Sequence, residues 1–506
     1  MKLPLLLIPM SGLAKRFSEY GINIDKQILK FDDGITPFEK SMDSLSNKNE
    51  FFIAFTVRSE TQKIWLKQIL LDKYENQFEY EISVTGETKS PIHSLNLVLK
   101  SLLTLNKVDR ESAVSIFTMD VEFGIKTDIP TSGNSTIIFK AKDGPYSFVT
   151  LDPTDRVLEC AEKESIGGWA NAGLYSVETI DALATTIDEV IAQDKKSGEL
   201  SIAEVLLSTN KTLGFIGKKI ESIYIFGTPE EWIYYNNEIL PFLLAQNQKR
   251  VVLLADHSGT DFLDQFSDAL VSAGWKVVVI DNSENYSWDS VIKDKENQLT
   301  NEYFNENAFI FVSCQSGQGM SNALSSVLST FVPVVATSGQ LRLALAHTMA
   351  RAISFSAEEL IKNNSIKECV DMLGTNFEGG RHQRRLLKMK TFDITAKTRI
   401  DSLSNYKDGW IIGDFLPRLA RLPFLEFGIK TIKNNMSGPD LHYHNSGVEI
   451  SLILEGGGTS GNRTIKKDDI LIQDPYTQDR NIFVDNTKIA VIRFTDRKPK
   501  KLYHYD

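Results

Sequence analysis

The sequence is poor in cysteine and has no long hydrophobic run. Its 506 residues include three cysteines, Cys160, Cys314 and Cys369, which lie far apart in the chain. Their spacing excludes a disulfide framework and a cysteine-based zinc site, and it favours a reducing compartment. The apolar run from Leu3 to Met10 is too short to span a bilayer and leads into a glycine-containing turn, so a buried strand is predicted there instead of a signal peptide. We therefore expect a cytoplasmic protein with no membrane span.

Positive charge is also scarce. The chain carries 56 Lys and Arg against 66 Asp and Glu, which gives a net charge of −10. Proteins that bind nucleic acid need a basic face for the phosphate backbone, so nucleic acid is excluded as the main partner. Small phosphorylated ligands need only a few local cations and remain compatible with this composition. The sequence shows no internal repeat and no low-complexity tract.

Three blocks differ in their hydrophobic pattern. Residues 1–243 alternate apolar strands with amphipathic helices, which predicts an α/β domain with a largely parallel sheet. The polar segment 245–250 is predicted to be a linker. A new strand from Val251 starts a second α/β domain over residues 249–390. From 395 to 506, short strands separated by Gly, Asn and Asp predict an all-β barrel or sandwich.

The first block opens with a strand that runs into a turn containing Gly12, Leu13, Lys15 and Arg16. A short glycine turn lets backbone N–H groups approach a phosphate closely. Arg16 and the later Lys26 can then neutralise a triphosphate and the pyrophosphate that develops from it.

The order of the following motifs resembles the sugar-phosphate nucleotidylyltransferase family, whose Rossmann-like fold is expected here. The motifs are the Gly12–Phe17 turn, Lys26, Thr85–Thr88, Thr118–Asp120, Ala161–Lys163, Trp169–Tyr175 and Gly227–Glu230. The resemblance implies catalytic roles for Arg16, Lys26 and Asp120, and a Mg²⁺ ion on Asp120. It implies nucleotide binding by Gly12, Leu13, Lys15, Gly86 and Thr88, and sugar-phosphate binding by Glu162, Lys163, Asn171 and Gly173.

Four residues depart from the family pattern. Ala14 and Ser90 stand where glycine is common, and Asp25 replaces the proline before the lysine. Ile225 occupies the position where many members carry a second metal-binding aspartate, and phosphoryl transfer relies on Mg²⁺. The alternative is therefore a degenerate domain that binds a nucleotide or a sugar phosphate without turnover.

In the second block, polar residues follow predicted strands. Asp256 and His257 come after one strand, and Cys314 ends another and enters a glycine-rich turn before a helix. Such a turn can lower the pKa of a thiol and present N–H groups to an oxyanion. Arg381 and Arg385 lie one helical turn apart and could clamp a phosphate if their segment is helical.

These features resemble the type B ribose-5-phosphate isomerases and the related galactose-6-phosphate isomerases. The resemblance implies an aldose–ketose reaction with Cys314 as the base, Ser316 as its supporting hydroxyl and Asp256 assisting ring opening. It also implies phosphate binding by His257, Arg381 and Arg385, and a homo-oligomer. Thr348, Gln315 and Gln318 depart from the pattern. Phosphosugar binding without turnover, with Cys314 as a buried structural thiol, is the alternative.

The third block contains His442, His444, Glu449 and Gly456, which resemble the first motif of a cupin barrel. Residues two apart in a strand share a face, so both imidazoles can point into the barrel. Two imidazoles and a carboxylate suit a divalent transition metal. The second cupin motif normally supplies a third histidine, but Arg480 falls near that place. The alternative is a metal-free cupin whose histidines pack in the barrel or contact an anion.

Together these blocks predict a multifunctional enzyme that prepares an activated sugar for capsule or lipopolysaccharide. The first domain would transfer a nucleotidyl group from an NTP to a sugar phosphate with release of pyrophosphate, and the second would isomerise or bind a sugar phosphate. The competing hypothesis is a non-catalytic sensor or scaffold for nucleotide sugars or phosphosugars, built from degenerate enzyme domains.

Overall fold

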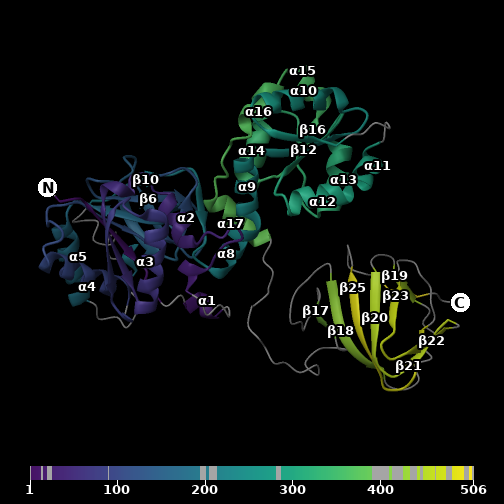
Figure 1. The fold of residues 1–506 in the computed structure, drawn as a ribbon, viewed down its shortest axis with the longest axis horizontal. Coiled ribbons are helices and arrows are strands. Elements are labelled where there is room, and N and C mark those ends of the chain that lie inside the picture. Colours follow the sequence, from purple (N-terminus) through teal and green to yellow (C-terminus); the bar gives the residue numbers. More distant parts are fainter. Residues whose placement is uncertain are drawn as a thin grey trace. The chain divides into compact units, whose positions relative to one another are not determined.

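The computed structural model describes residues 2–12, 15–19, 25–88, 90–193, 201–203, 214–280, 287–389, 410–412, 425–432, 442–444, 448–461, 463–473, 481–494 and 501–503. By its internal contacts the chain divides into two compact units, residues 1–18 with 23–389 and residues 19–22 with 390–506 (Figure 1). The first unit contains two sheets. We name the part built on the first sheet, up to Gln248, the first lobe, and residues 249–389 the second lobe.

The first lobe is built on a nine-stranded sheet. Seven strands form its main path in the order β10 (Ile216–Lys219), β6 (Ser135–Lys140), β9 (Trp169–Val177), β4 (Val114–Phe117), β1 (Leu5–Pro9), β2 (Phe52–Val57) and β3 (Glu79–Val84). β4, β1, β2 and β3 run parallel, whereas β9 is antiparallel to both β4 and β6. β7 (Ser147–Leu151) and β8 (Val157–Glu162) join beside β9. The predicted α/β class is confirmed, with a mixed sheet.

Alternate side chains of the central strand β1 enter two different cores. Leu6 and Ile8 pack in one apolar cluster, and Leu5 and Leu7 pack in the other. This division follows from the twofold period of a strand, and a strand covered on both faces reads as a continuous apolar run. The covering helices include α2 (Pro37–Asp43), α3 (Glu60–Tyr74), α4 (Pro91–Thr104) and α5 (Ile180–Gln193).

A small two-stranded sheet lies within the same lobe. It pairs β5 (Val121–Phe123) with β11 (Ile223–Ile225) in antiparallel register. After β11 the chain enters α8 (Pro229–Tyr234), a π-helical turn η3 (Tyr235–Ile239) and α9 (Leu240–Gln248). Thr228 begins α8 with a capping box, because its side chain accepts from the Glu231 N–H and Glu231 accepts from the Thr228 N–H.

The predicted linker over residues 245–250 is wrong. α9 continues to Gln248, and the next strand begins at Arg250. Leu240, Phe242 and Ala245 of this helix are buried in a core that extends into the second lobe. Burial of this apolar face outweighs the polar composition of residues 246–250, which had suggested a loop.

The second lobe is a parallel five-stranded sheet with helices on both faces. Its strand order is β13 (Lys276–Val279), β12 (Arg250–Ala255), β14 (Phe309–Cys314), β16 (Ala352–Ser356) and β15 (Val334–Val335). Its helices are α10 (Thr260–Ser272), α11 (Trp288–Asp294), α12 (Glu296–Phe304), α13 (Gln318–Leu328), α14 (Ser338–Thr348), α15 (Ala357–Lys362), α16 (Ile366–Met372) and α17 (Gly380–Met389). The α/β class predicted for this part is confirmed.

One apolar core joins the two lobes. Phe31, Tyr224 and Phe226 of the first lobe belong to the same cluster of buried residues as Phe309 and Phe311 of the second. A continuous core makes residues up to 389 behave as one packed body, as the division into units also indicates.

Among the described residues from 410 onward, the C-terminal unit contains strands joined by turns and no helix. A five-stranded antiparallel sheet has the order β17 (Trp410–Ile412), β18 (Leu425–Ile432), β25 (Thr487–Phe494), β20 (Val448–Glu455) and β23 (Ile470–Gln473). β19 (His442–His444) pairs with β26 (Lys501–Tyr503), and β21 (Gly457–Ser460) pairs with β22 (Arg463–Lys466) and β24 (Asn481–Phe483). The predicted all-β class is confirmed, and the cupin barrel stays a prediction.

Candidate functional site

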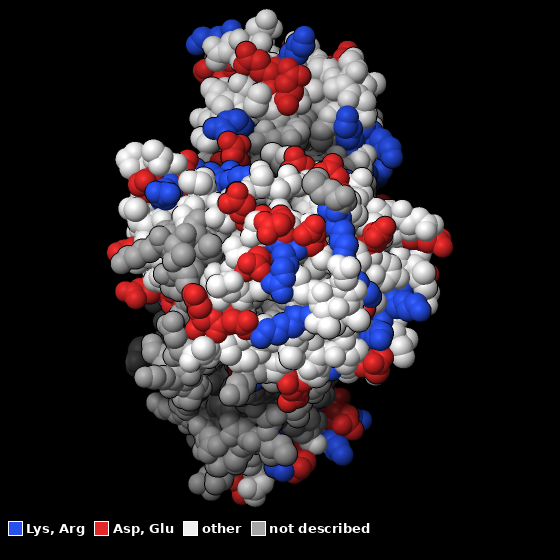
Figure 2. All heavy atoms as spheres, turned by 90° about the vertical axis from the view of Figure 1, so that its left-hand side faces the viewer, with Lys and Arg blue, Asp and Glu red and all other residues white. Residues whose placement is uncertain are grey.

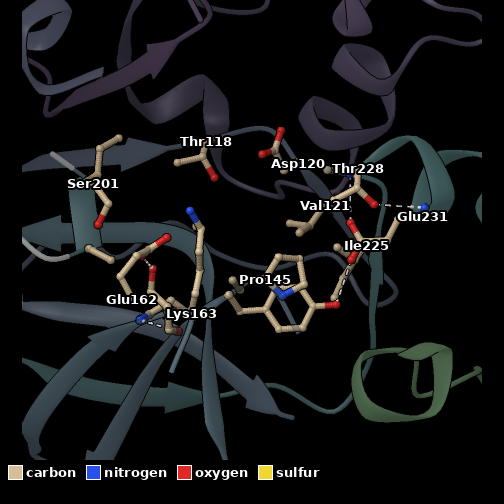
Figure 3. A pocket seen from close by; sticks show the side chains of 18 of the residues that line it. Thr118, Asp120, Val121, Pro145, Glu162, Lys163, Ser201, Ile225, Thr228 and Glu231 are labelled. Atoms are coloured by element: carbon tan, nitrogen blue, oxygen red, sulfur yellow. Dashed lines mark hydrogen bonds between the residues drawn. The ribbon is translucent and has the colours of Figure 1, made fainter. Parts of the chain in front are cut away.

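A pocket of about 360 Å³ opens beside the central strands of the first lobe. Figure 3 shows Thr118 and Asp120 on one wall and Glu162 and Lys163 on the opposite wall, with the Lys163 side chain reaching across toward Thr118. One cavity therefore brings together motif residues that are distant in the sequence. Arg16 and Lys163, for example, are 147 positions apart and both line it. Asn171 and Gly173 also line it, and sugar-phosphate binding by them stays a prediction.

The wall that carries Asp120 has an unusual backbone. Met119, between Thr118 and Asp120, adopts a φ of 62°, which is the left-handed region that side chains other than glycine rarely adopt. Gly173 lies directly behind this turn, since a Cβ atom on it would come within 2.1 Å of Thr118 Oγ1. Glycine at this position is therefore needed for close approach. Strain of this kind collects at functional sites, where the surrounding structure holds it.

Asp120, which lines the pocket, forms an ion pair with Lys26, whose Nζ donates to Asp120 Oδ1. Both residues are predicted to be catalytic from the family resemblance, and the structure brings them together. Arg16, on α1 (Lys15–Glu19), is exposed and lines the same pocket.

Asp25, the departure from the expected proline, has a structural role. Its carboxylate accepts from Arg58 Nη2 at 2.8 Å and from Gln62 Nε2 at 2.7 Å, and Arg58 Nη1 donates to the carbonyl oxygen of Gly12 at 3.1 Å. Arg58 therefore ties the glycine turn to the segment that carries Lys26. No sequence motif had singled out Arg58 or Gln62, because their role depends on pairing with a distant loop.

Three hydroxyl groups connect the glycine turn to the predicted base-binding segment. Ser11 Oγ lies 2.7 Å from Ser94 Oγ, which lies 2.6 Å from Thr88 Oγ1. Gly86 in this segment has a φ of 69°. The predicted nucleotide residues Gly12, Lys15, Gly86 and Thr88 are all described, and Leu13 lies outside the described residues.

The opposite wall is held by side-chain amide and hydroxyl groups. Ser147 Oγ donates to Glu162 Oε2. Asn171 is buried and uses both ends of its amide, since its Oδ1 accepts from Thr136 Oγ1 at 2.8 Å and its Nδ2 donates to Ser147 O at 3.1 Å. Lys163 has a φ of 59°, so its backbone is also left-handed. This wall presents one carboxylate and one ammonium group to a ligand.

The far end of the pocket contains a buried pair that sequence reasoning missed. Tyr146 Oη donates to Glu231 Oε1 at 3.0 Å, and both residues line the pocket. Burial raises the pKa of the Glu231 carboxyl above its usual range. Glu231 also serves the α8 capping box, so its carboxylate is occupied by Tyr146 and by the helix terminus.

In the described part of the pocket, only the wall that carries Asp120 offers a carboxylate ligand for a magnesium ion beside the predicted triphosphate site. Among the described residues, the carboxylates that line it are Asp120, Glu162 and Glu231. Glu231 is occupied, and Glu162 lies on the wall opposite Asp120. Ile225, where a second metal-binding aspartate was expected, lies in the pocket wall and is buried. One carboxylate together with phosphate oxygens is a donor set that Mg²⁺ accepts, so Asp120 is the residue that would hold it.

The predicted second-lobe residues lie at the carboxyl edge of the parallel sheet. Asp256 and His257 follow β12, and Cys314 ends β14. The two turns touch, because the Gln315 N–H donates to Ser258 Oγ at 2.9 Å. The Asp256 carboxylate accepts from the Ser258 N–H and Oγ at 2.9 and 2.7 Å. Cys314 is buried, and Ser316 lies in the turn that precedes α13, where its Oγ accepts from the Gln318 N–H.

Arg381 and Arg385 lie at the other edge of that sheet. Both are on α17, so the predicted helix is confirmed. His382 of this helix stacks on His347, which is in the last turn of α14. α14 connects two parallel strands, β15 and β16, and must therefore return to the edge where β16 begins. Within one chain, the structure does not bring Arg381 and Arg385 to His257 or Cys314.

Around Arg381 lies a cluster of His347, Glu378 and His382, whose ligand atoms lie within 4.8 Å of one another. The two imidazole rings are stacked with their planes 13° apart and their centroids 4.0 Å apart, so their in-plane nitrogen lone pairs lie in separate, nearly parallel planes and do not converge on one ion. Arg381 Nε donates to His382 Nε2 at 3.1 Å and occupies that lone pair. The three residues therefore form a hydrogen-bonded cluster whose geometry does not suit a metal ion.

In the C-terminal unit, Glu449 is engaged by an arginine. Arg493 Nη2 and Nε donate to Glu449 Oε2 at 2.6 and 3.1 Å, and Arg493 Nη1 donates to Glu426. The backbone of His442–His444 forms β19, but the side chains of both histidines lie outside the described residues, as does Arg480. The metal site on His442, His444 and Glu449 stays a prediction.

Charges of both signs mix on the surface. On the face shown in Figure 2, Lys and Arg alternate with Asp and Glu, and no broad area has one sign. Among the described residues, every helix is too short or too polar to cross a bilayer.

Comparison with known proteins agrees with the second-lobe resemblance. Residues 251–389 match the family model described as Ribose/Galactose Isomerase. A probable ribose-5-phosphate isomerase B from Mycoplasma genitalium is 25% identical over 149 residues, which cover 28% of this chain and 95% of that protein.

Solved structures similar to the chain include two nucleotide-transferring enzymes. A nucleoside-diphosphate-sugar pyrophosphorylase from Vibrio cholerae is 23% identical and aligns over 46% of this chain and all of its own, with a TM-score of 0.41. A CTP:phosphocholine cytidylyltransferase from Streptococcus pneumoniae is 14% identical over 47% of this chain and all of its own, with a TM-score of 0.38.

Proposed function

We propose that the first lobe transfers a nucleotidyl group from a nucleoside triphosphate to a sugar phosphate and releases pyrophosphate. One observation carries the proposal. The Lys26–Asp120 pair and the Glu162–Lys163 wall face each other across one pocket, which is large enough for two phosphorylated groups to meet. The motif resemblance in chain order supports the same assignment.

In this reaction an oxygen of the sugar phosphate attacks the α-phosphorus, and the bond from that phosphorus to the β-bridging oxygen breaks. Arg16 and Lys26 lie on the side of the glycine turn and neutralise the departing pyrophosphate. Lys163 on the opposite wall holds the attacking phosphate, and Glu162 accepts a hydroxyl of the sugar. The protein contributes mainly positioning and charge, as in other phosphoryl transfers.

Asp120 would hold Mg²⁺, which supplies charge neutralisation on the triphosphate when it is bound. Its ion pair with Lys26 keeps the carboxylate in place in the absence of ligand, and both groups can turn to the phosphates when the nucleotide enters.

A screen for pyrophosphate release tests the proposal directly. Full-length protein would be incubated with Mg²⁺, each of the common NTPs and a panel of sugar 1-phosphates. Turnover with at least one pair, abolished by Asp120→Asn and by Lys26→Ala, is expected. The second candidate, a non-catalytic binder, is favoured by Ile225 and is identified by calorimetric binding of the same ligands with no pyrophosphate released.

For the second lobe we propose binding and aldose–ketose isomerisation of a sugar phosphate. The match of residues 251–389 to the isomerase family supports this proposal. Because Cys314 and Arg381 lie at opposite edges of the sheet, one chain would supply the base and a second copy the phosphate-binding arginines. The active form would then be a homo-oligomer. Solvent deuterium incorporation at C2 of pentose and hexose phosphates, followed by NMR, tests the reaction.

The two lobes and the C-terminal unit together fit the preparation of an activated sugar for capsule or lipopolysaccharide, in the cytoplasm. We propose a divalent transition metal on His442, His444 and Glu449. Metal analysis of untagged protein should then show a nearly stoichiometric metal that the His442→Ala/His444→Ala double variant lacks. Metal-free protein that resists reconstitution would favour histidines packed in the interior.

A further inference from the structure

The segment that leads into the last helix of the second lobe packs against β11, and β11 contributes Ile225 to the wall of the first-lobe pocket. β11 pairs with β5 along one edge, and its other edge meets residues 377–383. The Ile223 N–H donates to the Glu378 carbonyl oxygen at 3.1 Å, and Ser222 Oγ donates to the Phe377 carbonyl oxygen at 2.6 Å. β11 is therefore held between its own lobe and a segment of the other.

At the Ile225 end of β11, the side-chain amide of Gln383 makes the two backbone hydrogen bonds that a neighbouring strand would otherwise make. The Ile225 N–H donates to Gln383 Oε1 at 2.9 Å, and Gln383 Nε2 donates to the Ile225 carbonyl oxygen at 2.5 Å. The exposed fraction of Gln383 is 2%, so water does not reach this pair of bonds. Loss of the glutamine amide would leave a buried backbone donor and acceptor without partners, which is costly.

Ile225 in turn determines where Asp120 lies. Ile225 pairs with Val121, the residue that follows Asp120, and the Phe226 N–H donates to the Asp120 carbonyl oxygen at 3.1 Å. Gly227 packs on the Asp120 side chain, since a Cβ atom on Gly227 would lie 3.4 Å from Asp120 Oδ2. Movement of the Ile225 backbone therefore moves the carboxylate that faces the ligand.

We propose that Gln383 is a positioning residue for nucleotidyl transfer in the first lobe, acting through Ile225 on Asp120. The inference rests on the function proposed above and deepens it, because the transferase site then includes a helix of the isomerase-like lobe. Gln383 lies beside Arg381 and Arg385 in sequence, so one helix carries residues for both lobes. Its own amide faces the first lobe.

The test compares two glutamine-to-methionine variants of the full chain. Gln383→Met keeps the buried volume and removes both hydrogen bonds. Gln246→Met is the matched control, because Gln246 Nε2 also bonds two backbone carbonyls, those of Leu373 and Thr375, and does not line the pocket. Turnover would be measured with the NTP and sugar phosphate pair that wild-type protein uses best, together with hydrogen–deuterium exchange.

For Gln383→Met, we expect kcat to fall roughly 10- to 100-fold while KM for the NTP stays within about twofold, because a displaced catalytic group costs rate. Exchange should accelerate in residues 118–122 and 223–227. Gln246→Met should accelerate exchange near residues 373–375 and leave kcat unchanged. A Gln383→Met protein with wild-type kcat, or one whose kcat falls no further than that of Gln246→Met, would overturn the inference.

Failure of the proposed function gives a different result. Wild-type protein that releases no pyrophosphate with any pair overturns nucleotidyl transfer itself. The exchange measurement then decides the remaining structural claim. Unchanged exchange in residues 118–122 of Gln383→Met shows that the glutamine does not position Asp120, whereas faster exchange there, absent from Gln246→Met, shows that it does.

Discussion

The imidazole ring of His382 stacks on that of His347, with ring centroids 4.0 Å apart. His382 also receives a hydrogen bond from Arg381 Nε and lies near Glu378. Burial, followed by the positive charge of a protonated His347, lowers the pKa of His382 from 6.5 to about 4. The imidazole is therefore neutral in the folded protein at neutral pH.

This lowered pKa predicts that acid destabilises the first unit. Between about pH 4 and 6.5 the unfolded chain binds a proton at His382 that the folded chain does not, so the free energy of unfolding falls as the pH falls through that window. Urea midpoints at pH 5 and pH 7 should differ less for His382→Asn than for wild type. His257→Asn, which changes an exposed histidine, should keep the wild-type difference. Equal pH dependence in wild type and His382→Asn would contradict the prediction.

Gly379 is predicted to be essential for the attachment of α17. A Cβ atom on it would lie 1.6 Å from the Ile223 carbonyl oxygen, and its φ is 64°. Gly379→Ala must therefore move the backbone of β11 or of residue 379, at a cost on the order of 2–4 kcal/mol. Gly374→Ala is the control, since a Cβ there meets nothing within 4 Å. The midpoint of thermal unfolding would be measured for both variants, and that of Gly379→Ala should be the lower. A Gly379→Ala protein as stable as the control would show that the close approach of residue 379 to β11 does not require glycine.

Ile225→Asp is predicted to strengthen metal binding in the pocket. The new carboxylate would stand on β11, beside Asp120 across the strand pair, and two carboxylates hold Mg²⁺ better than one. The Mg²⁺ concentration for half-maximal pyrophosphate release should fall by about tenfold. Ile225→Asn has the same shape without the charge and should show no such gain. The loss of a buried isoleucine lowers stability in both variants, so a gain common to both would not support metal binding.

Mixing of two inactive variants is predicted to restore isomerisation. If Cys314 of one chain works with Arg381 of another, Cys314→Ser and Arg381→Ala proteins should each fail to exchange the C2 proton at low substrate. A mixture, co-expressed to allow assembly, should recover part of the exchange in hybrid sites. The double variant Cys314→Ser/Arg381→Ala, mixed with wild type, controls for dilution. A mixture no more active than its components would show that the two residues do not share a site.

Local pattern predicted much of the fold and part of the site. The strands that begin near Leu5, Phe52, Val251 and Phe309 are continuous apolar runs, and the polar residues directly after them lie at strand ends. Lys26 and Asp120 were predicted to serve one nucleotide site, Lys26 on the phosphates and Asp120 on a metal ion, and the structure joins them in an ion pair. Their residue types, and the place of Asp120 shortly after a strand, are visible in the sequence without knowledge of packing.

The features that the sequence did not predict depend on distant partners. Tyr146 and Glu231 are 85 positions apart, and Ile225 and Gln383 are 158 apart. Each pair is a buried polar contact whose partners are set by how helices and strands pack, and a periodic pattern carries no information on that choice. The end of α9 was predicted to be a linker for a similar reason. Its apolar side chains are buried in a core that residues of both lobes form, and the local sequence does not reveal that core.

The chain passes between the two lobes twice, outward through α9 and back at residues 377–383. The second lobe is thus fastened to the first at both of its ends, as a domain inserted into a host would be. Such a double attachment removes the freedom of a single hinge, so the lobes cannot swing apart without breaking the bonds along β11. A protease cut between Gln248 and Lys249 would leave two fragments that stay associated through the hydrogen bonds along β11.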